Sequence, residues 1–150
     1  MLSNVFELEM KVRDYECDMQ GVVNNAIYQN YLEHTRHEFL QSLGEDFDKW
    51  TQDGVFPMVS KATLEYKRSL RSGDKFVVTL NIERKGIKYI FHQNIYRLPD
   101  YELCLKGEIE IVTLVGGRLT RGEEFRSLFG PYLLNAKEEL KQIEVEPEVV

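Results

Sequence analysis

Cysteine and histidine are scarce in this 150-residue chain, which contains two cysteines and three histidines. Cys17 and Cys104 lie far apart and form no C-x-x-C pair, and the histidines do not complete a zinc-ligand spacing with them. The spacing of these residues therefore argues against redox chemistry and against a metal site. We expect neither a metal nor an organic cofactor.

Positive charge is also in deficit, since 19 Lys and Arg residues stand against 25 Asp and Glu residues, for a net charge of −6. No basic stripe is long enough to neutralise a row of phosphates, which argues against nucleic-acid binding and a membrane-surface role. No apolar run approaches the roughly 20 residues of a membrane span, and residues 1–7 lack the pattern of a signal peptide. We expect a cytoplasmic protein without stable membrane insertion.

Hydrophobic residues, in contrast, are plentiful at 43% of the chain, and aromatic residues make up 11%. A chain of this length buries a substantial core without disulfide or metal support. No repeat, low-complexity tract or linker divides it, so residues 1–150 are predicted to form a single domain.

Hydrophobic periodicity predicts an order of strands and helices. Residues 6–12 alternate apolar and polar side chains, as in a strand with one buried face. Residues 26–43 repeat their apolar side chains at helical spacing, Asn24 or Asn25 is placed to cap that helix, and Gly44 suits its end. Asp53-Gly54 and Pro57 indicate a loop. Further strands are predicted over residues 62–66, 76–86, 87–97 and 103–114, followed by a helix with Tyr132, Leu133, Ala136, Leu140 and Ile143 on one face.

This order of elements favours an α+β fold. Strands joined by short turns form a largely antiparallel sheet. Because one long helix must cover it, the sheet is expected to curl around that helix.

The loop before the long helix carries the residues best suited to chemistry. Asp18 and Gly21 precede Asn24 and Asn25 at the predicted start of the helix, where unpaired backbone N–H groups favour a developing oxyanion. These groups suit attack on a carbonyl carbon. An Asp shortly before a helix is, however, more often a turn or capping residue than a catalyst.

The run from Arg13 to Glu33, RDYECDMQGVVNNAIYQNYLE, resembles the signature of hotdog-fold thioesterases. The order of Asp, two residues, Gly-Val-Val, then Tyr and a helical Glu is similar to 4-hydroxybenzoyl-CoA thioesterases and YbgC-type acyl-CoA thioesterases. Val-Asn-Asn and the following Tyr are similar to the corresponding motif of plant and bacterial thioesterases that act on acyl-acyl carrier protein (acyl-ACP). The resemblance extends over roughly residues 5–120 and includes Pro57-Met58-Val59-Ser60, Leu64-Glu65-Tyr66, Ser72-Gly73-Asp74 and Arg84-Lys85-Gly86. It implies a hotdog fold, in which a curled antiparallel sheet of about five strands wraps around one central helix, with a C-terminal helix in addition.

The resemblance also implies a mechanism. Asp18 takes the place of the catalytic carboxylate, as general base or as nucleophile, and the backbone N–H of Asn25 polarises the thioester carbonyl. Glu33 resembles the catalytic helical Glu of another hotdog branch, although an ion pair with Arg36 or His37 explains it more simply. The histidines that related patterns carry at the positions of Asn25 or Val22 are absent here, which argues against a His-assisted scheme.

Substrate contacts follow from the same resemblance. Coenzyme A or phosphopantetheine, as part of the substrate, needs cations near its phosphates. Lysines and arginines on the strands and turns could supply them, although a solvated basic face explains these side chains equally well. Predicted binding residues are Gly21, Val23, Asn24, Tyr28, Ser60, Lys61, Arg84, Lys85 and Lys88, with Lys67 and Arg68 as further cations.

Three functional hypotheses remain. The first is a thioesterase acting on acyl-CoA or acyl-ACP, the second a noncatalytic acyl-thioester-binding hotdog protein, and the third a hotdog dehydratase or isomerase, which generally needs a His beside the acid. In the family the active sites lie where two sheets join edge to edge. A homodimer, or a tetramer built from dimers, is therefore expected.

Overall fold

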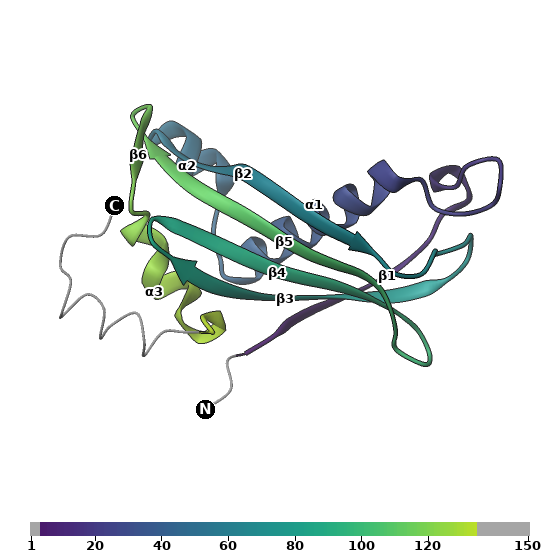
Figure 1. Cartoon of the computed structure of the whole chain (residues 1–150). Coiled ribbons are helices and arrows are strands. Elements are labelled where there is room, and N and C mark those ends of the chain that lie inside the picture. The colour runs from purple at the N-terminus through teal and green to yellow at the C-terminus, as the bar shows by residue number, and fades with distance from the viewer. Residues whose placement is uncertain (1–3, 135–150) are drawn as a thin grey trace.

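The computed structural model describes residues 4–134 and has one antiparallel sheet wrapped around a central helix (Figure 1). The sheet order is β1-β3-β4-β5-β2, and the short strand β6 pairs with β5. The strands are β1 (Phe6–Lys11), β2 (Val55–Tyr66), β3 (Lys75–Lys85), β4 (Lys88–Arg97), β5 (Glu102–Val115) and β6 (Arg118–Thr120). The predicted α+β architecture is confirmed.

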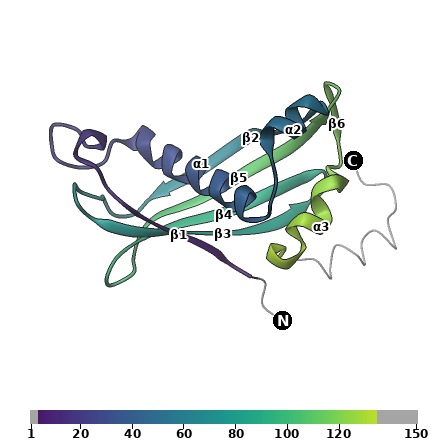
Figure 2. The same ribbon diagram turned by 180° about the vertical axis from the view of Figure 1, so that it is seen from behind.

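The central helix α1 (Asn25–Ser42) lies in the concave face of the sheet, as Figure 2 shows from behind. Asn24 caps it, because its side chain accepts a hydrogen bond from the Ala26 N–H at 2.9 Å. The predicted apolar stripe is buried against alternate residues of β3, which face inward. This buried set consists of Tyr28, Tyr31, Leu32, Thr35, Phe39 and Leu40 on α1 and Phe76, Val78, Leu80 and Ile82 on β3.

Two features between α1 and the sheet differ from the sequence prediction. A short helix, α2 (Phe47–Gln52), follows α1, and β2 begins at Val55 rather than at residue 62. The predicted loop at Pro57 was wrong because β2 is an edge strand, where a missing N–H is tolerated. The register also shifts between Val59 and Lys61, which interrupts the alternation that sequence periodicity detects.

The chain after β6 forms three short helical segments. They are the 3-10 helix η2 (Glu123–Phe125), the helix α3 (Arg126–Phe129) and the 3-10 helix η3 (Gly130–Tyr132). A short helix therefore precedes Gly130-Pro131. Three positions of the predicted apolar face, Ala136, Leu140 and Ile143, lie outside the described residues.

Candidate active site

The loop from Cys17 to Asn24 is closed by backbone hydrogen bonds. The Asp18 N–H donates to the Val22 carbonyl at 2.9 Å, and the Gly21 N–H donates to the Asp18 carbonyl at 3.0 Å. Gly21 adopts φ +79°, a left-handed conformation that favours glycine. The tight turn holds Asp18 in the loop that leads into α1.

One oxygen of the Asp18 carboxylate is anchored by this turn. Oδ1 accepts hydrogen bonds from the N–H groups of Gln20 at 2.8 Å and Val22 at 3.4 Å. Within residues 4–134, Oδ2 accepts no hydrogen bond. Asp18 thus acts as a turn residue through one oxygen and keeps the other available, on an exposed side chain.

The N-terminus of α1 supplies a complementary donor. The Ala26 N–H is bound by the Asn24 side chain, and the Ile27 N–H donates to the Asn24 carbonyl. The Asn25 N–H meets no acceptor in the described part of the chain. It is therefore available to an oxygen atom, at the positive end of the helix dipole.

A cavity of about 260 Å³ brings these two groups together. We call it the Asp18 pocket. The β2–β3 connection forms its other wall, because the Val23 N–H donates to the Leu70 carbonyl at 2.8 Å and ties the two loops together. The lining residues are Asp18, Val22, Val23, Asn24, Asn25, Tyr28, Tyr66, Lys67, Arg68 and Ser69.

Two tyrosines fix the helix end within this pocket. The Tyr28 hydroxyl accepts a hydrogen bond from the Leu70 N–H at 3.0 Å, and burial raises the pKa of Tyr28. Its ring packs edge to face on Tyr66, with centroids 5.5 Å apart. The Tyr66 hydroxyl donates to the Asn25 carbonyl at 3.4 Å. Tyr28 is therefore an anchor of the pocket wall, whereas the half-exposed Tyr66 faces the opening.

The structure places two of the predicted cations at the pocket. Lys67 pairs with Glu65 at 3.3 Å and Arg68 with Glu102 at 2.8 Å, and both remain exposed. Ser69 was not predicted, because it joins Asp18 at this pocket only through the contact between the two loops.

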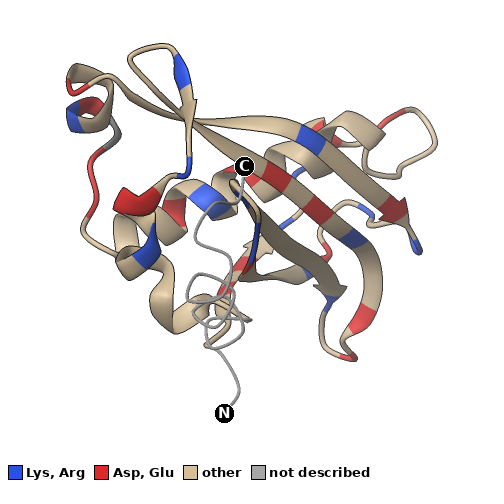
Figure 3. Cartoon of the chain, turned by 60° about the vertical axis from the view of Figure 1, so that its left-hand side comes forward, with Lys and Arg blue, Asp and Glu red and all other residues tan. Residues whose placement is uncertain are grey.

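The other predicted binding residues lie elsewhere. Lys61 and Lys88 approach Glu110 at 3.9 and 2.9 Å, and the Ser60 hydroxyl donates to the Glu110 carbonyl at 3.2 Å. Lys85 is exposed at the end of β3. Figure 3 shows acidic and basic residues on the same strands of the sheet.

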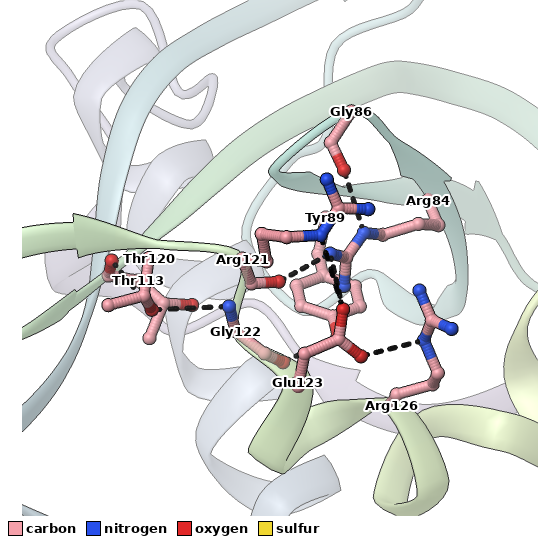
Figure 4. Close-up of polar contacts among 9 residues, drawn as sticks. All are labelled: Arg84, Gly86, Tyr89, Thr113, Thr120, Arg121, Gly122, Glu123 and Arg126. Atoms are coloured by element: carbon pink, nitrogen blue, oxygen red, sulfur yellow. Dashed lines mark hydrogen bonds and ion pairs between the residues drawn. The ribbon is translucent and has the colours of Figure 1, made fainter. Parts of the chain in front are cut away.

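Arg84, also predicted to bind substrate, is buried at 3% exposure. Its guanidinium donates to the carbonyls of Gly86 and Arg121, lies over the Tyr89 ring and pairs with Glu123 at 3.7 Å (Figure 4). The Tyr89 hydroxyl in turn donates to the Gly122 carbonyl at 2.7 Å. We call these contacts the Arg84 cluster. They hold the segment after β6 against the end of the β3–β4 hairpin.

Glu33 lies outside the Asp18 pocket and lines a second cavity of about 240 Å³. We call it the aromatic cavity. It lies between α1, the concave face of the sheet, α2 and the segment held by the Arg84 cluster. Its walls are Leu40, Trp50, Pro57, Val59, Tyr89, Phe91, Ile111, Phe125 and Phe129, and its polar members are Glu33, Arg36 and His37.

Residues 12–139 match the sequence family described as the thioesterase-like superfamily. This chain belongs to that superfamily. It is 44% identical over 108 residues to an Arabidopsis thaliana chloroplastic acyl-acyl carrier protein thioesterase, ATL3, a match that covers 71% of this chain and 57% of the relative. A second Arabidopsis chloroplastic acyl-acyl carrier protein thioesterase, ATL2, is 40% identical over 129 residues, or 84% of this chain and 69% of the relative.

The fold of this superfamily member is shared with a solved thioesterase. The structure of a Synechocystis 1,4-dihydroxy-2-naphthoyl-CoA thioesterase superposes with a TM-score of 0.79 at 14% identity, covering 85% of this chain and 96% of the other. The hotdog fold implied by the sequence is thereby confirmed. In the described residues, no helix is long and apolar enough to cross a membrane, and no group of three or more His, Cys, Asp or Glu side chains is arranged to hold a metal ion.

Proposed function

We propose that this protein hydrolyses the thioester of an acyl-CoA or an acyl-ACP to a free acid and a thiol. One observation carries the proposal: a carboxylate oxygen of Asp18 and the N–H of Asn25, both without a partner in residues 4–134, share one pocket. A base or nucleophile beside an oxyanion donor is the arrangement that acyl transfer requires. Superfamily membership and the thioesterase names of the Arabidopsis relatives support it.

The reaction follows one of two routes at this site. In the first, Asp18 takes a proton from water as the water oxygen bonds to the acyl carbon, the C–S bond breaks, and the proton passes to the leaving sulfur. In the second, Asp18 attacks the acyl carbon and expels the thiolate, and water then hydrolyses the resulting anhydride. In both routes the Asn25 N–H binds the developing oxyanion, an interaction typically worth about 3 kcal/mol of barrier.

The test is thiol release from a panel of acyl-CoAs and acyl-ACPs by the wild type and by Asp18→Asn. Since an Asn side-chain oxygen still accepts from Gln20 and Val22, the loop should keep its shape. We expect kcat/KM to fall by about 10²–10⁴-fold, while the matched variant Asp100→Asn, at an exposed turn, remains active. Undiminished activity in Asp18→Asn would move the chemistry elsewhere, with Glu33 as the next candidate.

The carrier's phosphates are proposed to lie near Lys67 and Arg68. These are the cations that line the Asp18 pocket, and both are exposed to solvent. A phosphate there remains partly hydrated, so it requires no enclosed phosphate loop.

We further propose a homodimer, alone or as half of a tetramer, that completes the site. Strand β2 has a free edge with exposed apolar side chains at Phe56, Met58, Val59 and Tyr66. If two copies pair their β2 strands antiparallel about a two-fold axis at mid-strand, the Tyr66 end of one lies beside the Val55 end of the other. The Asp18 pocket of one copy then adjoins the aromatic cavity of its partner, which supplies room for the acyl group.

A noncatalytic acyl-thioester-binding protein is the second candidate, because the Oδ1 contacts of Asp18 are those of an ordinary turn residue. Binding of acyl-CoA and acyl-ACP without thiol release from any of them would favour this alternative. The cytoplasmic location stays a prediction for cell fractionation to test, since the Arabidopsis relatives are named as chloroplastic.

A further inference from the structure

A polar side chain stands in the middle of the core. Gln93 lies on β4 and is fully buried, with Phe91 and Ile95 on the same face of the strand. Its Nε2 donates to the Leu32 carbonyl at 3.0 Å, and its Oε1 accepts from Nη1 of Arg36 at 2.9 Å. Because burying an amide is costly unless it is hydrogen-bonded, both ends of Gln93 are committed, and one of them fixes the Arg36 guanidinium.

Arg36 is thereby held at the wall of the aromatic cavity. Desolvation by burial lowers the pKa of Arg36, and the negative charge of Glu33 opposes that shift. Within residues 4–134 the guanidinium makes one hydrogen bond, to Gln93, although arginine carries five N–H donors. The remaining donors belong to a partly buried side chain that lines the cavity.

The size and charge of the cavity limit what these donors can meet. At about 240 Å³ it exceeds the roughly 150 Å³ of apolar cavities that bind benzene. Its aromatic walls favour an apolar body. Glu33 and Arg36 both line the cavity, so an anion would meet the repulsion of Glu33 as well as the attraction of Arg36, whereas a neutral oxygen would accept a hydrogen bond from Arg36 without that repulsion.

We propose that Arg36, positioned by Gln93, determines acyl specificity by donating to a neutral carbonyl or hydroxyl oxygen on an acyl group in the aromatic cavity. This inference rests on the proposed thioesterase function, because it assigns the cavity to the acyl part of the substrate. Acyl groups that bear such an oxygen should be preferred over plain alkyl or aryl groups of equal size.

The first test measures binding without catalysis. Trp50 is the single tryptophan and lines the cavity, so one indole N–H signal in a ¹H–¹⁵N NMR spectrum reports on ligand entry. We expect acetophenone to bind at least ~10-fold more tightly than ethylbenzene, the equivalent of one good hydrogen bond, and more tightly than benzoate. Arg36→Met should reduce the acetophenone preference to within about 2-fold, and the exposed matched control Arg118→Met should retain it. Equal binding of acetophenone and ethylbenzene by the wild type, tighter binding of benzoate, or an unchanged preference in Arg36→Met would overturn the inference.

The second test uses acyl-CoA pairs of equal length, with and without one added carbonyl or hydroxyl oxygen. The ratio of their kcat/KM values should favour the oxygenated acyl group in the wild type and collapse in Arg36→Met. Gln93→Met, which removes the acceptor that holds Arg36, should lower the same ratio in part. Hydrolysis without any preference refutes the specificity role but leaves the thioesterase proposal intact. Conversely, if no thioester is hydrolysed, the thioesterase proposal fails, and the NMR titration alone decides whether Arg36 recognises the oxygen.

Discussion

Glu16 and Tyr31 connect the segment before the Asp18 loop to the central helix through a buried polar contact. Oε1 of Glu16 accepts from the Tyr31 hydroxyl and from the Arg13 N–H, both at 2.8 Å. Burial, followed by the hydrogen bond to Glu16 and its negative charge, raises the pKa of Tyr31 far above its usual value. The phenol therefore keeps its proton in the folded state and fixes Glu16 to α1 about one turn after Tyr28.

This contact predicts a pH dependence of stability. Above pH ~10 the unfolded chain releases the Tyr31 proton and the folded chain retains it, so the free energy of unfolding falls by up to about 1.4 kcal/mol per pH unit from this group. Tyr31→Phe should remove that part of the slope. At neutral pH the free energy of unfolding of the variant should be lower by about 1–3 kcal/mol, because Glu16 stays buried but loses the hydrogen bond from the Tyr31 hydroxyl. Urea unfolding of both proteins between pH 7 and 11 measures both effects, and parallel pH curves would contradict the assignment.

Gly21 allows a second prediction at this scale. A Cβ at this position meets no atom within 4 Å, so the cost of Gly21→Ala is the left-handed backbone alone, about 1–2 kcal/mol. Because Gly21 donates to the Asp18 carbonyl, any change of loop conformation should also lower kcat. Gly21→Asn should cost less, since Asn tolerates this conformation better. Thermal unfolding and thiol release check the order, and an Asn variant less stable than the Ala variant would refute the backbone explanation.

Single residues also show how far the sequence could predict the site. Arg84 lies on the same face of its strand as Leu80 and Ile82, and Gln93 lies on the same face as Phe91. The alternation of side chains along a strand could therefore have placed both in the interior. Their partners could not be predicted, because Arg121 and Arg36 reach them from distant segments. Residues 13–33, in contrast, carry a local motif from which Asp18 and Asn25 are predicted as site residues, and both line one pocket in the structure.

At the scale of elements, the Arg84 cluster positions part of the aromatic cavity. Phe125 and Phe129 line the cavity from the segment that follows β6, and their rings are 5.6 Å apart. The buried guanidinium joins this segment to the hairpin of β3 and β4. The cavity wall therefore depends on a polar anchor as well as on aromatic packing.

We predict that Arg84→Met loosens this wall. The substitution removes hydrogen bonds to two carbonyls and leaves those groups without their donor, at a cost of about 2–4 kcal/mol. Amide hydrogen exchange should accelerate over residues 121–129 and change little at Asp18. Arg71→Met, at an exposed turn, is the matched control. Uniformly faster exchange throughout the chain would indicate global destabilisation instead.

The elements were predictable to different degrees for physical reasons. Helix α1 and the strands β3, β4 and β5 are long segments rich in apolar residues, and the structure confirms them, although the register of β4 and β5 shifts between Ile95 and Tyr96. The early start of β2 was missed because a proline and an irregular register obscure its alternation. The strand β6 has three residues, too few for a periodic pattern.

At the scale of the whole molecule, the two cavities lie toward opposite ends of the exposed strand β2. Asn25 and Glu33 are eight positions apart on α1, which corresponds to about 12 Å along the helix. Within one copy, the Asp18 pocket and the aromatic cavity are therefore separated from each other along α1. This arrangement is the reason for proposing a two-fold pairing.

The pairing is tested by charging the free edge. The double variant Phe56→Lys, Met58→Lys places like charges on both copies where exposed apolar side chains are expected to meet. We expect light scattering to show a dimer for the wild type and a monomer for the variant, with loss of thiol release and a native circular dichroism spectrum. A monomeric wild type with full activity would refute the composite site.

The anchored oxygen of Asp18 also has a practical consequence. In Asp18→Asn the two loop N–H groups require the amide oxygen at the Oδ1 position, so the amide NH₂ takes the place of Oδ2. The substitution would thus present a donor where the proposed reaction needs an acceptor, without disturbing the Asn25 N–H, the proposed oxyanion donor. Such a variant is suited to trapping intact substrate, and crystals of it soaked with acyl-CoA would give a direct image of the thioester before cleavage.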